Sequence, residues 1–264
     1  MKTAIVIPAR YGSTRFPGKP LIKIGDKTML ERTCDVARNA ARDDKNVRVL
    51  VTTEDQRIAQ HAEEIGVECI MTSEDCPTGS DRALAAIKQL DERPDFVLNL
   101  QGDAPFTPLS VLCKMLEAMV PSIEVITPIC QLSWEDLYRL RTAKKTTPFS
   151  GTTAVIDKNG RALWFSKNII PAIRKEEELR GENTLSPVCQ HMGLYGFRTD
   201  ILEKFCALDP SPYELLEGLE QLRMLENGMH IQTILVDVEV GAIQSGIDTP
   251  EDAKRAEQLL KART

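Results

Sequence analysis

Apolar residues in the first hundred positions form two alternating kinds of segment. Short unbroken runs rich in β-branched residues, such as Ile5-Val6-Ile7, are typical of strands buried on both faces of a parallel sheet. Between them, apolar residues such as Met29, Leu30 and Val36 recur at helical spacing. The pattern predicts strands at residues 4–7, 47–52, 68–71 and 96–100, and helices at 29–41, 58–65 and 80–90. This alternation predicts an α/β fold with a mostly parallel central sheet covered by helices.

The pattern changes after residue 150. A hairpin is predicted around Asp157-Lys158-Asn159-Gly160, because Asn-Gly favours the turns that close hairpins. The flanking and later predicted elements are strands at 153–156, 162–166, 191–198 and 231–238, and helices at 213–226 and 250–261. Thr249 is the predicted N-cap of the last helix. The charged segment 174–181 is predicted as an exposed loop or helix end. We expect one domain over residues 1–264, with a hairpin-containing subregion at 150–200.

Composition narrows the class of protein. The 264 residues are ample for a buried core, and 42% hydrophobic with 27% charged residues is usual for a globular protein. The net charge of -6 and the 5% aromatic content disfavour a nucleic-acid-binding module. A small anionic substrate is not disfavoured, because a few local cations can hold one.

The cysteines and the N-terminus bear on location. The 7 cysteines form no CxxC pair, which predicts free thiols in a reducing cytosol. The N-terminal apolar run is too short for a signal peptide, and no run approaches the roughly 20 apolar residues of a membrane span. We therefore expect a cytoplasmic protein without a membrane span.

The loop after the first predicted strand concentrates anion-binding groups. Within ten residues it offers backbone N–H groups, the hydroxyls of Ser13 and Thr14, and the cations Arg10, Arg15 and Lys19. Ligands of open α/β sheets bind at the carboxyl ends of strands, and a triphosphate needs these groups. The loop is neither a Walker A loop nor a dinucleotide fingerprint. The alternative is an exposed basic surface loop.

The loop resembles the signature of the sugar nucleotidyltransferases, and more closely that of the 3-deoxy-manno-octulosonate (Kdo) cytidylyltransferases. The similarity extends over nearly the whole chain. Its motifs include Ile5-Val6-Ile7-Pro8-Ala9-Arg10, Thr78-Gly79-Ser80-Asp81-Arg82, Gln101-Gly102-Asp103, His191-Met192-Gly193-Leu194-Tyr195-Gly196, Pro210-Ser211-Pro212, the run from Glu217 to Arg223, and Gly246-Ile247-Asp248-Thr249-Pro250-Glu251-Asp252.

The resemblance implies a Rossmann-like nucleotidyltransferase fold and a reaction. CTP and Kdo would give CMP-Kdo and pyrophosphate for lipopolysaccharide biosynthesis, in a homodimer formed through the hairpin region. Lys19, Arg10 and Asp103 would be catalytic. The implied nucleotide-binding residues are Pro8, Ala9, Arg10, Ser13, Thr14, Arg15, Lys19, Thr78, Gly79, Ser80, Arg82 and Gln101. The choice of CTP over UTP is likewise only implied by the family.

By the same resemblance, Asp103 and Asp248 hold a catalytic Mg²⁺. The chemistry agrees, because Mg²⁺ prefers oxygen ligands, commonly one or two carboxylates with water and substrate oxygens. The alternative for either aspartate is a turn residue or a helix cap.

The residues implied to face the sugar acid are Gln101, Lys167, His191, Tyr195, Glu217 and Gln221. Glu217 and Gln221 are four residues apart, so they are predicted to share a helix face. The alternatives are a solvated helix surface for that pair and a satisfied buried imidazole for His191.

Three departures from the family pattern bear on the acceptor. Ala104 stands where an acid is usual, Lys167 replaces an arginine, and Thr153 replaces a common lysine. Arginine to lysine loses the bidentate fork that suits a carboxylate. Two acceptors therefore stay open, Kdo and its 8-amino analogue (8-amino-3,8-dideoxy-manno-octulosonate). The sequence is also compatible with another sugar or sialic-acid nucleotidyltransferase and with a non-catalytic CTP-binding regulator.

Overall fold

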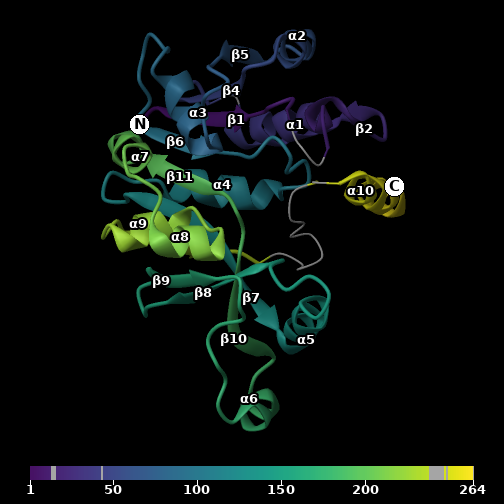
Figure 1. Ribbon diagram of the computed structural model, residues 1–264, viewed down its shortest axis with the longest axis vertical. Coiled ribbons are helices and arrows are strands. Elements are labelled where there is room, and N and C mark those ends of the chain that lie inside the picture. The colour runs from purple at the N-terminus through teal and green to yellow at the C-terminus, as the bar shows by residue number, and fades with distance from the viewer. Residues whose placement is uncertain (13–15, 43, 238–246, 248, 264) are drawn as a thin grey trace.

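The computed structural model describes residues 1–12, 16–42, 44–237, 247 and 249–263 (Figure 1). Its helices are α1 Met29–Ala41, α2 Gln56–Glu64, α3 Gly79–Ile87, α4 Leu109–Ala118, α5 Trp134–Ala143, α6 Glu176–Glu182, α7 Thr199–Cys206, α8 Pro212–Glu217, α9 Gln221–Glu226 and α10 Pro250–Arg263, with a 3-10 turn η1 at Lys19–Leu21. Its strands are β1 Thr3–Pro8, β2 Lys23–Ile24, β3 Lys27–Thr28, β4 Val47–Thr53, β5 Glu68–Met71, β6 Phe96–Asn99, β7 Val125–Ser133, β8 Thr152–Ile156, β9 Ala162–Ser166, β10 Leu185–His191, β11 Tyr195–Arg198 and β12 Ile231–Leu235.

One ten-stranded sheet runs through the molecule in the order β5-β4-β1-β6-β11-β7-β10-β8-β9, with β12 paired to β7. The pairs β4–β5, β1–β4 and β1–β6 are parallel, as the βα alternation predicts. β11 then runs antiparallel to both β6 and β7. The predicted hairpin forms as β8–β9 and extends the same sheet beyond β10.

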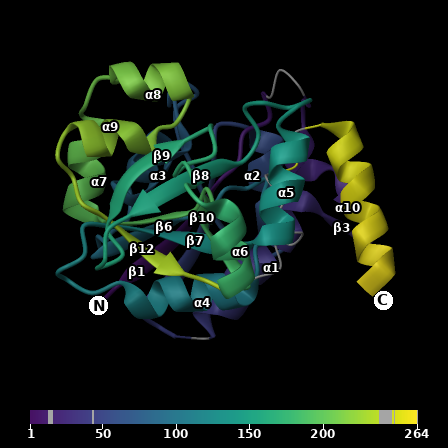
Figure 2. The ribbon, with the colours of Figure 1, turned by 90° about the horizontal axis from the view of Figure 1, so that it is seen from below.

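Helices cover both faces of the sheet (Figure 2). Along β1, Ile5 and Ile7 point to the core beneath α1, α2 and α4, whereas Ala4 and Val6 point to the core beneath α3 and α7. This strict alternation explains why the β1 sequence is apolar without a break. The carboxyl end of β1 therefore opens between two helical layers.

Three local predictions need correction. The predicted helix 213–226 is broken, because Gly218 ends α8 in the left-handed conformation with φ 62. Glu217 and Gln221 therefore lie on different helices and do not share a helix face. The predicted strand 191–198 is two strands, since His191 ends β10 and β11 begins at Tyr195. The predicted strand 231–238 ends at Leu235 within the described residues.

The other predicted helices form, but α2 begins two residues before the predicted 58 and α3 ends three residues before the predicted 90. Thr249 caps α10, since the Asp252 N–H donates to Thr249 Oγ1 at 3.1 Å. The charged segment 174–181 contains α6, which lies at one end of the long axis (Figure 1). Within the described residues, no helix is long and apolar enough to cross a membrane.

Substitution of Gly196 should destabilise the fold. Gly196 lies in β11 between β6 and β7, where an added Cβ would meet Ile126 Cγ2 at 2.7 Å. Because the buried side chains of Met119 and Ile126 would both have to shift, Gly196→Ala should lower the free energy of unfolding by about 1–3 kcal/mol, measured by urea denaturation. Gly193→Ala is the control, since nothing lies within 4 Å of its added Cβ. Equal stability of the two variants would show that β11 has room for a side chain at position 196.

Candidate functional site

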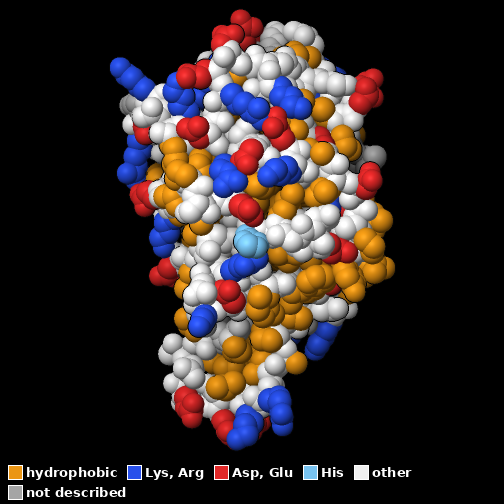
Figure 3. Space-filling model, turned by 90° about the vertical axis from the view of Figure 1, so that its left-hand side faces the viewer, with side chains coloured by type: hydrophobic (Ala, Val, Ile, Leu, Met, Phe, Trp, Pro, Cys, Tyr) orange, Lys and Arg blue, Asp and Glu red, His pale blue; other side chains and the backbone are white. Residues whose placement is uncertain are grey.

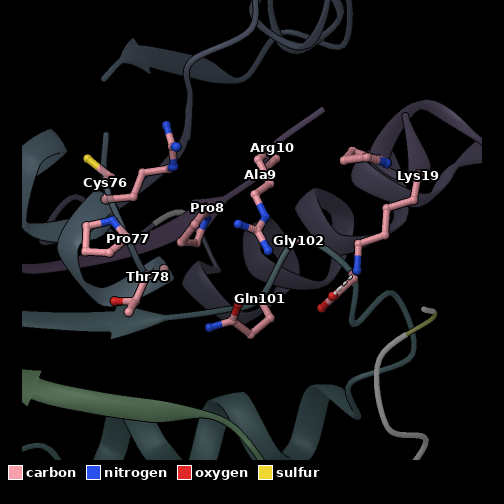
Figure 4. Close-up of a pocket in the computed structure, with 13 residues that line it drawn as sticks. Pro8, Ala9, Arg10, Lys19, Cys76, Pro77, Thr78, Gln101 and Gly102 are labelled. Carbon is pink, nitrogen blue, oxygen red and sulfur yellow. Dashed lines mark hydrogen bonds and ion pairs between the residues drawn. The ribbon is translucent and has the colours of Figure 1, made fainter. Parts of the chain in front are cut away.

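A cavity of about 300 Å³ opens at the carboxyl ends of β1 and β6 (Figure 4). Three segments line it: the loop after β1, the loop after β6 and the start of α3. The lining residues are Pro8, Ala9, Arg10, Lys19, Pro20, Cys76, Pro77, Thr78, Gly79, Arg82, Gln101, Gly102 and Asp103. The sequence-predicted nucleotide residues within the described chain are therefore brought together, except Ser80. Cys76, Pro77 and Pro20 were not predicted.

An ion pair closes one side of the cavity. Lys19 Nζ lies 2.5 Å from Asp103 Oδ2, and the two side chains are only 12% and 27% exposed. Arg10 points into the same cavity (Figure 4). Two cations and one carboxylate thus face a space large enough for phosphate groups, and the cations can balance negative charge on a bound anion.

Gly102 makes this arrangement possible. Its N–H donates to the carbonyl oxygen of Pro8 at 3.2 Å, so the loop after β6 lies directly on the end of β1. A Cβ at position 102 would lie 2.7 Å from the Pro8 oxygen. Only glycine allows this backbone approach, which fixes Asp103 opposite Lys19.

Arg82 lines the cavity and also supports its wall. Its guanidinium, only 4% exposed, donates to Thr72 Oγ1 at 2.8 Å and pairs with Glu54 Oε2 at 2.9 Å. Glu54 also accepts from the Tyr11 N–H at 3.2 Å. The Arg82–Glu54 pair therefore ties the start of α3 to the cationic loop. Thr78 acts as the N-cap of α3, accepting from the Asp81 N–H at 3.2 Å.

The segments of the two predicted metal ligands meet. The Ile247 N–H donates to the backbone oxygen of Asp103 at 3.0 Å. Asp248 follows Ile247 directly but lies outside the described residues, as do Ser13, Thr14 and Arg15. Among the described residues, no group of three or more His, Cys, Asp or Glu side chains can hold a metal ion. The Asp103 carboxylate at the cavity edge fits Mg²⁺, which commonly takes one or two protein carboxylates beside substrate phosphates.

His191 lies at the centre of the predicted sugar residues. Its Nε2 is 2.8 Å from Thr127 Oγ1, and its ring packs against Phe165 and Tyr195 at centroid distances of 4.9 and 5.4 Å. Burial, aided by the charge of Lys167, lowers the pKa of His191 to about 3. The imidazole is therefore neutral at pH 7. It has the hydrogen bond expected of a satisfied buried histidine.

Glu217 is engaged by the end of the hairpin. Its Oε1 accepts from Ser166 Oγ and its Oε2 from the Lys167 N–H, both at 2.7 Å. Gln221 is only 3% exposed. The interpretation of this pair as a solvated helix surface is therefore wrong for both residues.

A row of polar residues joins the two halves of the site, and sequence reasoning missed two of its members, Asn99 and Glu220. Ser80 Oγ donates to Glu220 Oε1 at 2.6 Å and accepts from Asn99 Nδ2 at 3.4 Å. Tyr195 stands opposite Asn99 across the β6–β11 pair, so their side chains share one face of the sheet. The only sequence signal for Glu220 was its position within the run from Glu217 to Arg223. Its pKa is raised by burial.

Three buried polar atoms along this row have no hydrogen-bond partner within the described part of the chain: Asn99 Oδ1, Tyr195 Oη and Gln221 Nε2. Each such atom costs about 1–3 kcal/mol when it stays unpaired. A polyhydroxylated ligand or ordered water can satisfy them. Polar groups without a partner thus lie buried near the anion-binding cavity.

Comparison with known proteins decides the family. A family model described as "Cytidylyltransferase" matches residues 4–231. The chain belongs to the cytidylyltransferase family. It is 45% identical to a 3-deoxy-manno-octulosonate cytidylyltransferase of Maricaulis maris, over 99% of this chain and 98% of that protein. It is 37% identical to the protein of the same name from Cytophaga hutchinsonii, over 95% and 94% of the two chains.

The fold agrees with that of solved cytidylyltransferases. A CMP:2-keto-3-deoxy-manno-octonic acid synthetase complexed with CTP superposes with a TM-score of 0.84 at 31% identity, covering 100% of both chains. A cytidylyltransferase from Leptospira borgpetersenii matches in fold alone, with a TM-score of 0.61 at 21% identity. The chain is therefore a nucleotidyltransferase of this family.

The neutral His191 makes stability depend on pH. In the unfolded chain the His191 imidazole binds a proton near pH 6.5, whereas in the folded chain it binds one only near pH 3. Between these two values acid therefore favours unfolding. Between pH 6.5 and about pH 5, wild-type protein should lose about 1.4 kcal/mol of unfolding free energy per pH unit more than His191→Gln. Chemical denaturation at several pH values measures both slopes. Parallel slopes would show that His191 titrates normally.

Proposed function

We propose that the chain transfers CMP from CTP to the anomeric 2-hydroxyl of Kdo and releases pyrophosphate, for lipopolysaccharide biosynthesis. The observation that supports this best is the juxtaposition of two unlike surfaces. A cavity with Arg10, Lys19 and Asp103 lies beside a buried polar row that includes Tyr195, whose ring packs against that of His191. The names of the relatives supply CTP and Kdo as substrates. The free state of the 7 cysteines suits a cytoplasmic location.

The proposed chemistry is direct in-line displacement. The sugar hydroxyl attacks the α-phosphorus, the bond to the β-phosphate oxygen breaks, and pyrophosphate leaves. Lys19 and Arg10 neutralise the charge that grows on the departing group. The Thr78–Gly79 start of α3 places backbone N–H groups at the same cavity. Positioning and charge neutralisation provide most of the catalysis in such transfers.

Asp103 and Asp248 are proposed to hold Mg²⁺. When bound, the ion neutralises phosphate charge and brings the acceptor near the α-phosphate. The backbone hydrogen bond from Ile247 to Asp103 supports this assignment, because it holds the two aspartate segments together. Such an ion would compete with the Lys19 ammonium for the Asp103 carboxylate, because the two side chains form an ion pair.

The 8-amino analogue of Kdo is the second candidate acceptor. The half-buried Glu220 carboxyl beside Tyr195 can accept from a hydroxyl or from an ammonium group. Thr153, which stands where the family commonly has a lysine, is fully buried, and its hydroxyl donates to the Asn168 backbone oxygen at 2.7 Å. Position 153 therefore offers no side chain that can reach the acceptor.

The acceptor is tested by comparing kcat/KM for Kdo, its 8-amino analogue and a sialic acid, with CTP or UTP and Mg²⁺. Formation of CMP-Kdo with CTP as the preferred nucleotide supports the proposal. A higher kcat/KM for the 8-amino analogue would identify that analogue as the acceptor. A higher kcat/KM for a sialic acid would place the chain in another branch of the family. CTP binding without any product would favour the non-catalytic regulator.

Removal of the Asp103 carboxylate should stop the reaction without unfolding the chain. Asp103→Ala should form product at less than about one hundredth of the wild-type rate, because the Mg²⁺ that would balance charge on the transferred group loses a ligand. Pyrophosphate release measures activity, and circular dichroism checks the fold. Asp91→Ala, at an exposed position, is the control. Undiminished turnover of Asp103→Ala would count against the metal site.

We also propose a homodimer formed through the hairpin region. β9 is the last strand of the sheet order and presents an open edge. Large apolar side chains are exposed on β9 and on the adjoining α8, which meet through Trp164 and Tyr213 (Figure 3). They include Leu163 at 55%, Leu215 at 71% and Leu216 at 79% exposure. Such a patch is typical of a subunit interface.

Sedimentation velocity tests the dimer. Wild-type protein should sediment as a dimer, and Leu163→Lys should sediment as a monomer, because a charge on the edge strand opposes pairing. Val120→Lys, at an exposed apolar residue between α4 and β7, should leave the dimer intact. A monomeric wild type would refute this part of the proposal.

A further inference from the structure

One lysine outside the predicted site ties together the segments around the acceptor residues. Lys144 follows α5, and its Nζ donates to the backbone oxygens of Ser150, Gly151 and Lys167. The distances are 2.9 Å to Gly151 and 2.5 Å to Lys167. A single ammonium therefore joins the loop before β8 to the residue that follows β9. Because each bond uses a charged donor, this contact is stronger than a neutral hydrogen bond.

The Lys167 backbone is also held from the other side. The Lys167 N–H donates to Glu217 Oε2 at 2.7 Å, while Glu217 Oε1 accepts from Ser166 Oγ. The backbone of Lys167 thus donates to a carboxylate from α8 and accepts from an ammonium next to α5. Both ends of one residue are fixed by charged groups from separate elements.

The hydrogen bonds from Lys144 and to Glu217 fix the Lys167 backbone and therefore the point from which its side chain extends. The charge of Lys167 reaches His191 and Lys144, since it lowers the pKa of both after the larger effect of burial. Glu217 opposes the fall that burial causes in the pKa of Lys167 itself. Because the Lys144 ammonium is used on backbone oxygens, Lys167 is the cation that lies near His191 and Glu217, two of the residues implied to face the sugar acid.

We infer that Lys144 and Glu217 are positioning residues that fix the Lys167 backbone and thereby aim the Lys167 ammonium at the carboxylate of the acceptor. The inference rests on the proposed function. It assigns a role to Lys144, which neither the sequence motifs nor the cavity pointed to. A lysine has no fork to orient it on a carboxylate, so its position must come from its backbone.

Steady-state kinetics of Lys144→Met test this role. The variant should raise KM for the sugar acid about ten-fold or more, because misplacing a binding group weakens its contact, while KM for CTP changes less than about two-fold. Lys145→Met is the matched control, since Lys145 is the exposed neighbouring lysine. Lys144→Arg, which keeps a cation able to donate to several carbonyls, should recover part of the loss.

A double-mutant cycle separates positioning from a general structural role. If Lys144 acts through Lys167, adding Lys144→Met to Lys167→Met should change the acceptor KM little further. Independent, multiplying effects, or an equal rise of both KM values, would overturn the inference. If Lys144→Met does not fold, the same cycle with Glu217→Gln tests the Lys167 backbone from the opposite side: its effect on the acceptor KM should largely vanish in the Lys167→Met background, which loss of a direct contact between Glu217 and the sugar would not give.

The outcome for wild-type enzyme keeps the two proposals distinct. Wild-type turnover of the sugar acid with an unchanged acceptor KM in Lys144→Met would overturn the positioning role and leave the proposed function standing. Wild-type protein that forms no CMP-sugar from any acid would overturn both.

Discussion

The contact between Gly102 and the Pro8 carbonyl is the constraint on which the site depends. It joins the loops after β1 and β6 at the carboxyl edge of the parallel half of the sheet. Because the two loops are held together, Lys19 forms an ion pair with Asp103, and the Ile247 N–H donates a hydrogen bond to the backbone oxygen of Asp103. A cationic loop and two distant carboxylate segments are thus brought to one place by backbone packing. The chemistry follows from that geometry, since charges placed near a phosphate need little reorganisation to act on it.

The sequence predicted the parallel half of the fold well, because its strands obey one simple rule. β1 and β6 are buried on both faces and β4 is buried from Leu50 onward, and the apolar runs of these strands indicate this burial. The region 100–150 was not predicted. Pro128 argues against a central strand, yet it lies inside β7. It is tolerated because β7 changes neighbours there, pairing with β11 up to Ile126 and with β10 from Ile129. Such an exchange of partners leaves no periodic signal.

The candidate site was predictable where a motif supplied its residues and not where tertiary packing did. Pro8, Lys19, Gln101 and Asp103 line one cavity, as the resemblance implied. Ser80 belongs to the same motif as Thr78 but faces Glu220 instead of that cavity. A glycine inside a helical pattern gave no reliable break, so the turn at Gly218 was missed and the functions of Glu217 and Glu220 were not separated. Lys144 has no motif at all, because its acceptors are backbone oxygens.

The turn at Gly218 gives two neighbouring carboxylates different duties. Glu217 lies before the turn and accepts a hydrogen bond from Ser166 at the end of the hairpin, whereas Glu220 lies after the turn and accepts one from Ser80 in α3. The spacing of these few residues therefore sets the distance between the contacts at the hairpin end and at α3. Insertions are usually well tolerated in surface turns, but a longer turn here would shift one carboxylate relative to the other. Under the proposed function, a new acceptor preference should therefore arise more easily through side-chain exchange than through a change in the length of this turn.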